Sequence, residues 1–206
     1  MIISLFLTNP INAIVFLLAI GLAIGVHEAS HAWVADRLGD NTARLMGRTS
    51  INPLVHLDLI GTILFLLAGF GWGKPVPVNE HRLRRSTDII VVALAGPASN
   101  LGIAIILSLI FRLGLIPSLQ AVFSLFIFIN LALMLFNLIP VPPLDGSKVL
   151  RLFIHNLAYH FLEQYGVILL LFLFFLLRFG DSGLGGWLIQ AISLIFHLLT
   201  GSAFNF

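Results

Sequence analysis

The chain of 206 residues is 59% hydrophobic and only 10% charged, with a formal net charge of +2 and a mean hydropathy of +1.05. These values exclude an ordinary soluble domain and predict a multi-pass protein of the lipid bilayer, and the small net charge gives no reason to expect a nucleic-acid partner. Because the chain has no cysteine, disulfides and thiolate metal sites are also excluded, so any metal must be held by histidine and carboxylate.

The first full membrane span is predicted at residues 11–38, after an apolar stretch at residues 1–7 that is too short to cross a bilayer. Asn9-Pro10 separates the two segments, because proline restricts the backbone of the residue before it. Gly21 and Gly25 stand four residues apart, at the small-xxx-small spacing of membrane helices. This spacing predicts that the first span packs closely against neighbouring helices.

Three polar side chains, His27, Glu28 and His31, interrupt the second half of this span in the pattern H-E-x-x-H. Four residues of helix advance the chain by about 6 Å and about 40°, so both imidazoles lie on one face and can bind one metal ion. Glu28 then lies beside the metal as a general base. The alternative is a pair of interfacial histidines with an exposed glutamate, but ionisable groups within hydrocarbon are costly and usually functional.

The segment after the first span, at residues 42–79, is less uniformly apolar and is predicted to contain little regular helix. Residues 42–53 are polar and favour strands or an irregular hairpin, and two prolines restrict residues 74–79 to an edge strand or extended loop. Between them, residues 57–70 are apolar but only about fourteen in number, which is typical of a re-entrant or partly inserted segment.

The remainder of the chain is predicted to be helical and largely within the membrane. Two spans, an amphipathic or interfacial helix and a closing pair of spans are expected at residues 87–113, 119–139, 147–159, 162–179 and 187–199. Asn130 and Asn137 share one face of the second of these helices. The predicted fold is therefore an all-α polytopic bundle of about five to six membrane segments with a small membrane-associated β-sheet or hairpin.

Basic residues predict the orientation in the membrane. Seven of the eleven lie between the first span and the span at 87–113, namely Arg37, Arg44, Arg48, Lys74, Arg82, Arg84 and Arg85. Lys148 and Arg151 follow the turn at Pro140–Gly146, whereas Arg112 and Arg178 fall at the opposite ends of their spans. By the positive-inside rule the long polar segment and the turn face the cytosol, so a site near His31 opens towards the cytosol.

A catalytic zinc site needs a third protein ligand besides His27 and His31. The candidates are His56, His81, His155, His160, His197, Asp36, Asp58, Asp88 and Asp145. Asp145 differs from the others because it lies in a proline-rich turn, after a span that carries Asn137, on the predicted side of His31. His56 is expected to have a gating or auxiliary role, or to brace a loop, because permanent ligation would displace the water that hydrolysis needs.

Several segments of the chain resemble the site-2 protease family of intramembrane zinc metalloproteases, in its small PDZ-less prokaryotic branch. Three signatures carry the resemblance: His27-Glu-Ala-Ser-His31, Gly96-Pro-Ala-Ser-Asn100 and Asn137-Leu-Ile-Pro-Val-Pro-Pro-Leu-Asp-Gly146. Further similar blocks are Asn52-Pro-Leu-Val-His-Leu-Asp58 and Gly73-Lys-Pro-Val-Pro-Val-Asn79. The resemblance covers roughly residues 11–150, with the blocks in the order of the family.

This resemblance implies one Zn²⁺ per chain, held by His27, His31 and Asp145, with Glu28 as the base and Asn137 as a polar group near the oxyanion. It implies a single membrane-embedded metalloprotease domain over residues 1–206, with a catalytic core at about 11–150 and a helical hairpin at about 160–200. The implied substrate is a transmembrane protein or peptide, cleaved within or near its membrane segment, and the implied location is a prokaryotic plasma membrane.

Two other functions compete with this one. A metal transporter would use the same groups as a transit site, but it predicts further carboxylates or histidines along the spans, and few are present. A non-catalytic zinc-binding membrane scaffold would need a fourth protein ligand, for which His56 is the candidate.

Overall fold

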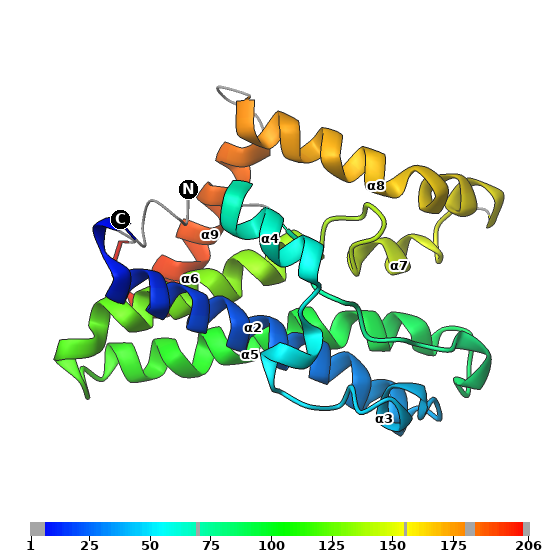
Figure 1. Cartoon of the computed structure of the whole chain (residues 1–206), viewed down its shortest axis with the longest axis horizontal. Helices are drawn as coiled ribbons and strands as arrows, with labels where there is room; N and C mark the ends of the chain where they lie inside the picture. Colours follow the sequence, from blue (N-terminus) through cyan, green and yellow to red (C-terminus); the bar gives the residue numbers. More distant parts are fainter. Residues whose placement is uncertain (1–6, 69–70, 155, 180–183, 204–206) are drawn as a thin grey trace.

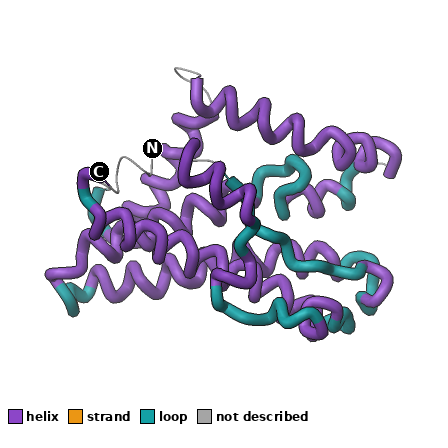
Figure 2. The backbone as a smooth tube through the Cα atoms, in the orientation of Figure 1, coloured by secondary structure: helices purple, strands orange, loops and turns teal. Residues whose placement is uncertain are grey.

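The computed structural model describes residues 7–68, 71–154, 156–179 and 184–203, and the regular structure in these ranges is helical (Figures 1 and 2). The predicted small sheet or hairpin is wrong. In the described part of the chain, strand-like pairing is limited to an isolated antiparallel bridge between Leu57 and Gly73. The polar segment instead folds into two short helices, α3 (Thr42–Leu45) and the 3₁₀ helix η1 (Pro53–His56).

A buried arginine explains why the segments around 42–56 and 74–79 lie together without forming a sheet. The Arg48 guanidinium donates hydrogen bonds to the backbone carbonyls of Val55, Lys74 and Pro75. These carbonyls would accept from a partner strand in a ladder, and Pro75 and Pro77 have no N–H to donate to one. A side chain therefore holds the two segments together where sequence patterning predicted strand pairing.

Three helices are long and apolar enough to cross a membrane: α2 (Pro10–Arg37), α5 (Asp88–Arg112) and α6 (Gln120–Asn137) together with η3 (Pro117–Leu119). They correspond to three of the predicted spans and lie side by side in Figure 1. Within the described residues, the apolar parts of α8 (Asn156–Phe179) and α9 (Leu184–Thr200) are shorter than a span. In the described part of the chain, three helices rather than the predicted five to six are therefore long and apolar enough to cross a membrane.

The remaining predicted elements also change in detail. The apolar stretch at 57–70 contains α4 (Leu59–Ala68), whose ten residues extend about 15 Å and cannot cross a bilayer. The predicted interfacial helix at 147–159 is divided between α7 (Gly146–Leu150) and the start of α8. The turn of the predicted C-terminal hairpin lies outside the described residues, and Figure 1 shows α8 away from α2 and α5.

The core forms where α2, α5, α6 and α9 meet. Small side chains of α2, Ala19 and Ala23, pack on Ile129 of α6, and on the other side of α6 Ile127 packs with Phe196 of α9. Without a hydrophobic driving force between helices in lipid, such small residues let helices approach closely and gain van der Waals contact.

Gly21 and Gly25 do not serve the helix contact that their spacing predicted. A Cβ on Gly25 would lie 2.4 Å from the backbone oxygen of Ile51, and one on Gly21 would lie 3.4 Å from Pro53 Cβ. The two glycines therefore let an irregular segment, rather than another membrane helix, lie directly against α2.

Asp40 links two segments of the chain just after the end of α2. Its buried carboxylate accepts hydrogen bonds from Thr42 N–H at 3.0 Å and from Asn79 N–H at 2.6 Å. Burial acts to raise the pKa of Asp40, but the hydrogen bonds from Thr42 and Asn79 and the charge of Arg82 lower it below its usual value. Asp40 thereby holds the 74–79 segment against the end of α2.

Candidate metal centre

Helix α2 presents both histidines of the H-E-x-x-H pattern to one side of the bundle. Their Nε2 atoms lie 3.1 Å apart, and the side chains are buried, with 6% of His27 and 7% of His31 exposed. The helix begins at Asn9-Pro10, where the Asn9 side chain accepts from Asn12 N–H, and it continues unbroken past His31. The separation of four residues on a continuous helix therefore produces the predicted pair.

Asp145 reaches the same point from the turn between α6 and α7. Its Oδ2 lies 3.1 Å from His27 Nε2 and 3.3 Å from His31 Nε2. One ligand atom from each residue falls within 4.8 Å of the others, so the three side chains could hold a metal ion. The structure thus brings together two residues predicted from the motif and one predicted from the resemblance.

The chemistry of these three atoms fits a cation. Asp145 Oδ2 is buried and accepts no hydrogen bond from any described residue, although two ring nitrogens face it. Burial acts to raise the pKa of this carboxyl, but contacts with His27 and His31 lower it to about 2, so it is an anion at neutral pH. A buried anion without a hydrogen-bond donor is costly unless a cation lies beside it.

The opposite nitrogen of the His31 ring supports the same conclusion. His31 Nδ1 lies 2.7 Å from the backbone oxygen of Val92, which can only accept, so Nδ1 carries the proton. In the neutral ring, Nε2 then presents its lone pair towards His27 and Asp145. Metal-bound histidines are commonly held in this way, with the second nitrogen donating to an oxygen.

Gly96 of α5 forms a wall directly against the Nε2 atoms of the two histidine rings. A Cβ at this position would lie 2.4 Å from His31 Nε2 and 2.6 Å from His27 Nε2. Any larger residue would occupy the space in front of the ligand atoms, which explains a glycine in the Gly96–Asn100 block.

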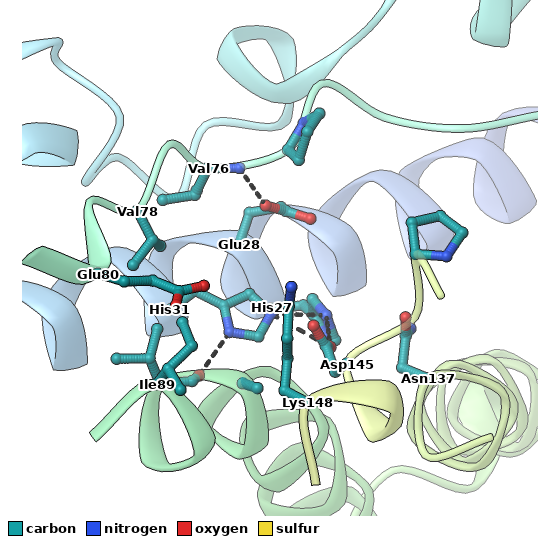
Figure 3. A pocket seen from close by; sticks show the side chains of 14 residues that line it. His27, Glu28, His31, Val76, Val78, Glu80, Ile89, Asn137, Asp145 and Lys148 are labelled. Carbon is teal, nitrogen blue, oxygen red and sulfur yellow. Dashed lines mark hydrogen bonds and ion pairs between the residues drawn. The ribbon is translucent and has the colours of Figure 1, made fainter. Parts of the chain in front are cut away.

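The three candidate ligands line a cavity of about 320 Å³ together with Glu28 (Figure 3). Glu28 Oε2 accepts a hydrogen bond of 3.0 Å from the backbone N–H of Val76, which belongs to the 74–79 segment. Asn137 also lines the cavity, and its Nδ2 donates to the backbone oxygen of Leu133 at 2.9 Å. Glu28 and Asn137 therefore share one cavity with the candidate ligands.

His56 is not part of this centre. The side chain is fully buried, its Nε2 lies 2.7 Å from the backbone oxygen of Ser50, and it does not line the cavity. Its own backbone oxygen accepts from Lys74 N–H at 2.7 Å. The position corresponds to the loop-bracing alternative for His56, and it supplies no fourth ligand.

The other candidates for a third ligand have different partners or lie elsewhere. Asp36 pairs with Arg44, Asp58 accepts from Gly61 N–H, and Asp88 accepts from Arg85 N–H. Three histidines, His81, His160 and His197, are absent from the residues that line the cavity, and His155 lies outside the described residues. Four further residues that contact the centre or its neighbours had no role predicted from the sequence, namely Gly96, Asn100, Asn130 and Val76. The visible signal for the asparagines was their presence in apolar helices, where buried amides are costly.

Comparisons with known proteins agree with this geometry. The family described as Peptidase family M50 matches residues 115–179. The protein named "Putative zinc metalloprotease YwhC" of Bacillus subtilis is 40% identical over 158 residues, which cover 71% of this chain and 72% of that protein. Rip2 of Mycobacterium tuberculosis, whose name carries the same description, is 30% identical over 86% of this chain and 71% of its own length. Stage IV sporulation protein FB of Bacillus subtilis is 28% identical over 64% of this chain and 48% of its own length. No solved structure matches the chain.

Proposed function

The chain belongs to peptidase family M50, the site-2 protease family of zinc metalloproteases, and on this premise we propose that it hydrolyses peptide bonds within or near the transmembrane segments of membrane proteins. The observation that carries the proposal is the placement of Glu28 in one cavity with His27, His31 and Asp145, on and beside a helix long enough to span a bilayer.

We assign His27, His31 and Asp145 as the residues that would hold the zinc ion, which leaves an open position towards the cavity. When bound there, zinc polarises the scissile carbonyl and makes water more acidic.

Glu28 would act as the general base. It takes a proton from the attacking water as the new C–O bond forms, and it delivers that proton to the nitrogen as the C–N bond breaks. The hydrogen bond from Val76 N–H to one carboxylate oxygen leaves the other oxygen free to accept the proton. Asn137, on the wall of the same cavity, has a second amide hydrogen that could stabilise the developing oxyanion.

The substrate has to be extended when it reaches this centre. A transmembrane helix hides its peptide bonds in i→i−4 hydrogen bonds, so the segment to be cut must unwind first. Pro75, Val76 and Val78 line the cavity and would lie beside the unwound segment.

The distribution of charge supports a cytosolic opening of the site. Arg44, Arg48, Lys74 and Arg82 lie in the segments after α2, which pack around the end of α2 nearest to His31. By the positive-inside rule this end is cytosolic, and the bacterial relatives support a location in a prokaryotic plasma membrane. The proposed domain is the whole chain, with the catalytic core at about residues 11–150 and a helical hairpin at about 160–200.

The proposed activity is tested by comparing the wild-type protein with Glu28→Gln. Purified protein in detergent is incubated with zinc and a panel of single-span membrane peptides, and the products are identified by mass. Glutamine keeps the size of the side chain and can still accept from Val76 N–H, but it cannot take up a proton. Cleavage should fall by about 10²–10⁴-fold.

Glu163→Gln provides the matched control, because Glu163 lies on α8, outside the cavity, and pairs with Lys148. This variant should cut at a rate close to that of wild type. Cleavage of the same bond by Glu28→Gln at the wild-type rate would contradict the proposed function.

A further inference from the structure

Two buried asparagines form a chain of hydrogen bonds behind the candidate metal centre. Asn100 of α5 is completely buried and Asn130 of α6 is 1% exposed. Neither lines the cavity that holds Glu28. Both lie in helices that are long and apolar enough to span a membrane, where an amide is retained only at a cost in free energy. The contacts of these two amides therefore call for an explanation.

The direction of each hydrogen bond follows from groups whose chemistry allows one role only. The backbone oxygen of Phe126 can only accept, so the atom of Asn130 at 2.8 Å from it is Nδ2. Asn130 Oδ1 then faces Asn100, whose Nδ2 donates to it at 2.9 Å and also lies 3.3 Å from the backbone oxygen of Ala23. Both amide hydrogens of Asn100 are thereby used.

Asn100 Oδ1 is left as an acceptor, and it lies 2.6 Å from His27 Nδ1. The imidazole must therefore donate, so the proton of neutral His27 is on Nδ1 and the lone pair is on Nε2. Nε2 is the atom that faces Asp145 and His31. The order of hydrogen bonds from Phe126 through Asn130 and Asn100 thus specifies which nitrogen of His27 is available to a metal.

We infer that Asn100 and Asn130 are positioning residues for the zinc centre: they hold His27 in the Nδ1-protonated tautomer and fix the orientation of its ring. Asn130 orients the Asn100 amide, and Asn100 acts directly on His27. The two residues contact neither the cavity nor the attacking water. This inference rests on the proposed role of His27 as a zinc ligand.

The side chain of Asn100 also connects the three long helices beside the metal centre. His27 and Ala23 belong to α2, Asn100 to α5 and Asn130 to α6, so the amide of Asn100 joins the three long helices at the level of the metal centre. The corresponding acceptor for His31 Nδ1 is the backbone carbonyl of Val92, which also belongs to α5. Helix α5 therefore orients both imidazoles, one through a side chain and one through its backbone.

The inference is tested first by the zinc affinity of purified protein, measured by competition with a chelator and without any substrate. Asn100→Leu removes the acceptor at nearly constant size, and zinc affinity should fall by about 10–100-fold, the usual cost of losing such a partner. Asn100→Asp loses the hydrogen bonds to Ala23 and Asn130 but keeps an acceptor oxygen for Nδ1–H, so it should bind zinc clearly more tightly than Asn100→Leu. Asn130→Leu should cause a smaller loss than Asn100→Leu.

The zinc affinity of the double variant shows whether Asn130 acts on His27 through Asn100 or the two residues act independently. If Asn130 acts through Asn100, then Asn100→Leu combined with Asn130→Leu should bind zinc no more weakly than Asn100→Leu alone. Ser108→Ala is the matched control, because Ser108 is a buried polar residue of α5 whose hydroxyl bonds the Ala104 carbonyl, two turns beyond Asn100. Its zinc affinity should equal that of wild type.

The tautomer itself is read by nitrogen NMR of zinc-free protein labelled on histidine, with the His27 signals assigned by their loss in His27→Gln. Wild type should show a protonated Nδ1, and Asn100→Leu should lose this preference. A simple loss of packing would lower the unfolding temperature of Asn100→Asp and Asn100→Leu alike and reduce their zinc affinity in parallel.

Parallel loss in these two variants, or wild-type zinc affinity in Asn100→Leu, would overturn the inference. An unprotonated Nδ1 of His27 in the wild-type protein would do the same. These outcomes are distinct from failure of the proposed function, which would appear as cleavage by Glu28→Gln at the wild-type rate. They are also distinct from failure of His27 as a ligand, which would appear as zinc binding that persists in His27→Ala.

Discussion

The backbone N–H of Val76 donates a hydrogen bond to Glu28 Oε2, so the proposed base is joined to a segment 48 residues further along the chain. The same segment is held at both ends by buried charged side chains. Arg48 donates to the carbonyls of Lys74 and Pro75, and Asp40 accepts from Asn79 N–H. Residues 74–79 are therefore positioned as one wall of the cavity by three separate groups, none of which belongs to a sheet.

Removal of a proposed ligand should release zinc, whereas removal of the nearby buried histidine should not. His27→Ala loses one of three ligand atoms, and its zinc content should fall from about one equivalent to well below half. His56→Ala should retain about one equivalent, because His56 bonds the Ser50 carbonyl and does not reach the cavity. Metal analysis of the purified variants measures both. Loss of zinc from both variants to the same extent would contradict the assignment of Asp145 as the third ligand.

Gly96→Ala should weaken zinc binding without weakening the fold. The added Cβ would lie 2.4 Å from His31 Nε2, so the ring has to move out of its present position. Alanine is favoured over glycine in a helix by about 1 kcal/mol, which offsets part of the cost of moving the ring, so the zinc-free protein should unfold close to the wild-type temperature. Zinc affinity should fall by at least about tenfold, or ~1.4 kcal/mol.

Gly102→Ala is the control for this substitution. Gly102 belongs to the same helix, and a Cβ there meets no atom within 4 Å. Its zinc affinity should match that of wild type. If Gly96→Ala and Gly102→Ala bind zinc equally well, Gly96 does not form the wall described above.

Asp40 should make the stability of the protein depend on pH in the acidic range. Its pKa is lowered in the folded protein, so its contribution is present above the pKa of the unfolded chain, near 3.8, and is lost as pH falls through the lower folded value. In Asp40→Asn an amide N–H faces a backbone donor, which should cost roughly 1–3 kcal/mol at neutral pH.

Thermal unfolding in detergent between pH 6 and pH 3 measures this effect. Wild type should lose stability at the acidic end more steeply than Asp40→Asn, which should already be less stable at pH 6. Asp36→Asn, which removes a carboxylate paired with Arg44 at the surface, is the control. Identical pH profiles for wild type and Asp40→Asn would exclude a contribution from Asp40.

The proposed orientation can be tested because the chain has no cysteine of its own. Ser86→Cys lies before α5, and Ser118→Cys lies between α5 and α6, and both positions are exposed. In intact cells an impermeant maleimide should label Ser118→Cys only, and Ser86→Cys should react after the cells are opened. Labelling of Ser86→Cys from outside would reverse the topology.

The sequence predicted those parts of the candidate metal centre that depend on the geometry of a single helix. His27 and His31 lie four residues apart on a helix, and the helix alone places their rings together. Asp145 could not be placed in this way, because its position depends on how α6 and the following turn pack against α2. Residues alone left it one candidate among several, and the resemblance to a family selected it.

The sheet was predicted wrongly because a single side chain replaced backbone pairing. Alternation and prolines around 42–56 and 74–79 are compatible with strands, but nothing in a linear pattern indicates that Arg48 donates to the carbonyls of both segments. The roles of Asn100 and Asn130 were hidden for a similar reason. Each is a lone polar residue in an apolar helix, and the direction of their hydrogen bonds appears only when three helices are packed together.

The separation of the ligands along the chain has a consequence for biosynthesis. His27 and His31 are synthesised and inserted early, whereas Asp145 is more than one hundred residues later, beyond the helices that supply Gly96, Asn100 and Asn130. Domains and their parts become available in the order of translation. A nascent chain therefore carries Glu28 into the membrane without a complete set of ligands. With His27, His31 and Asp145 as the proposed ligands, hydrolytic activity would arise only after the turn that carries Asp145 has joined the bundle, so the growing chain would not be cleaved before the site is complete.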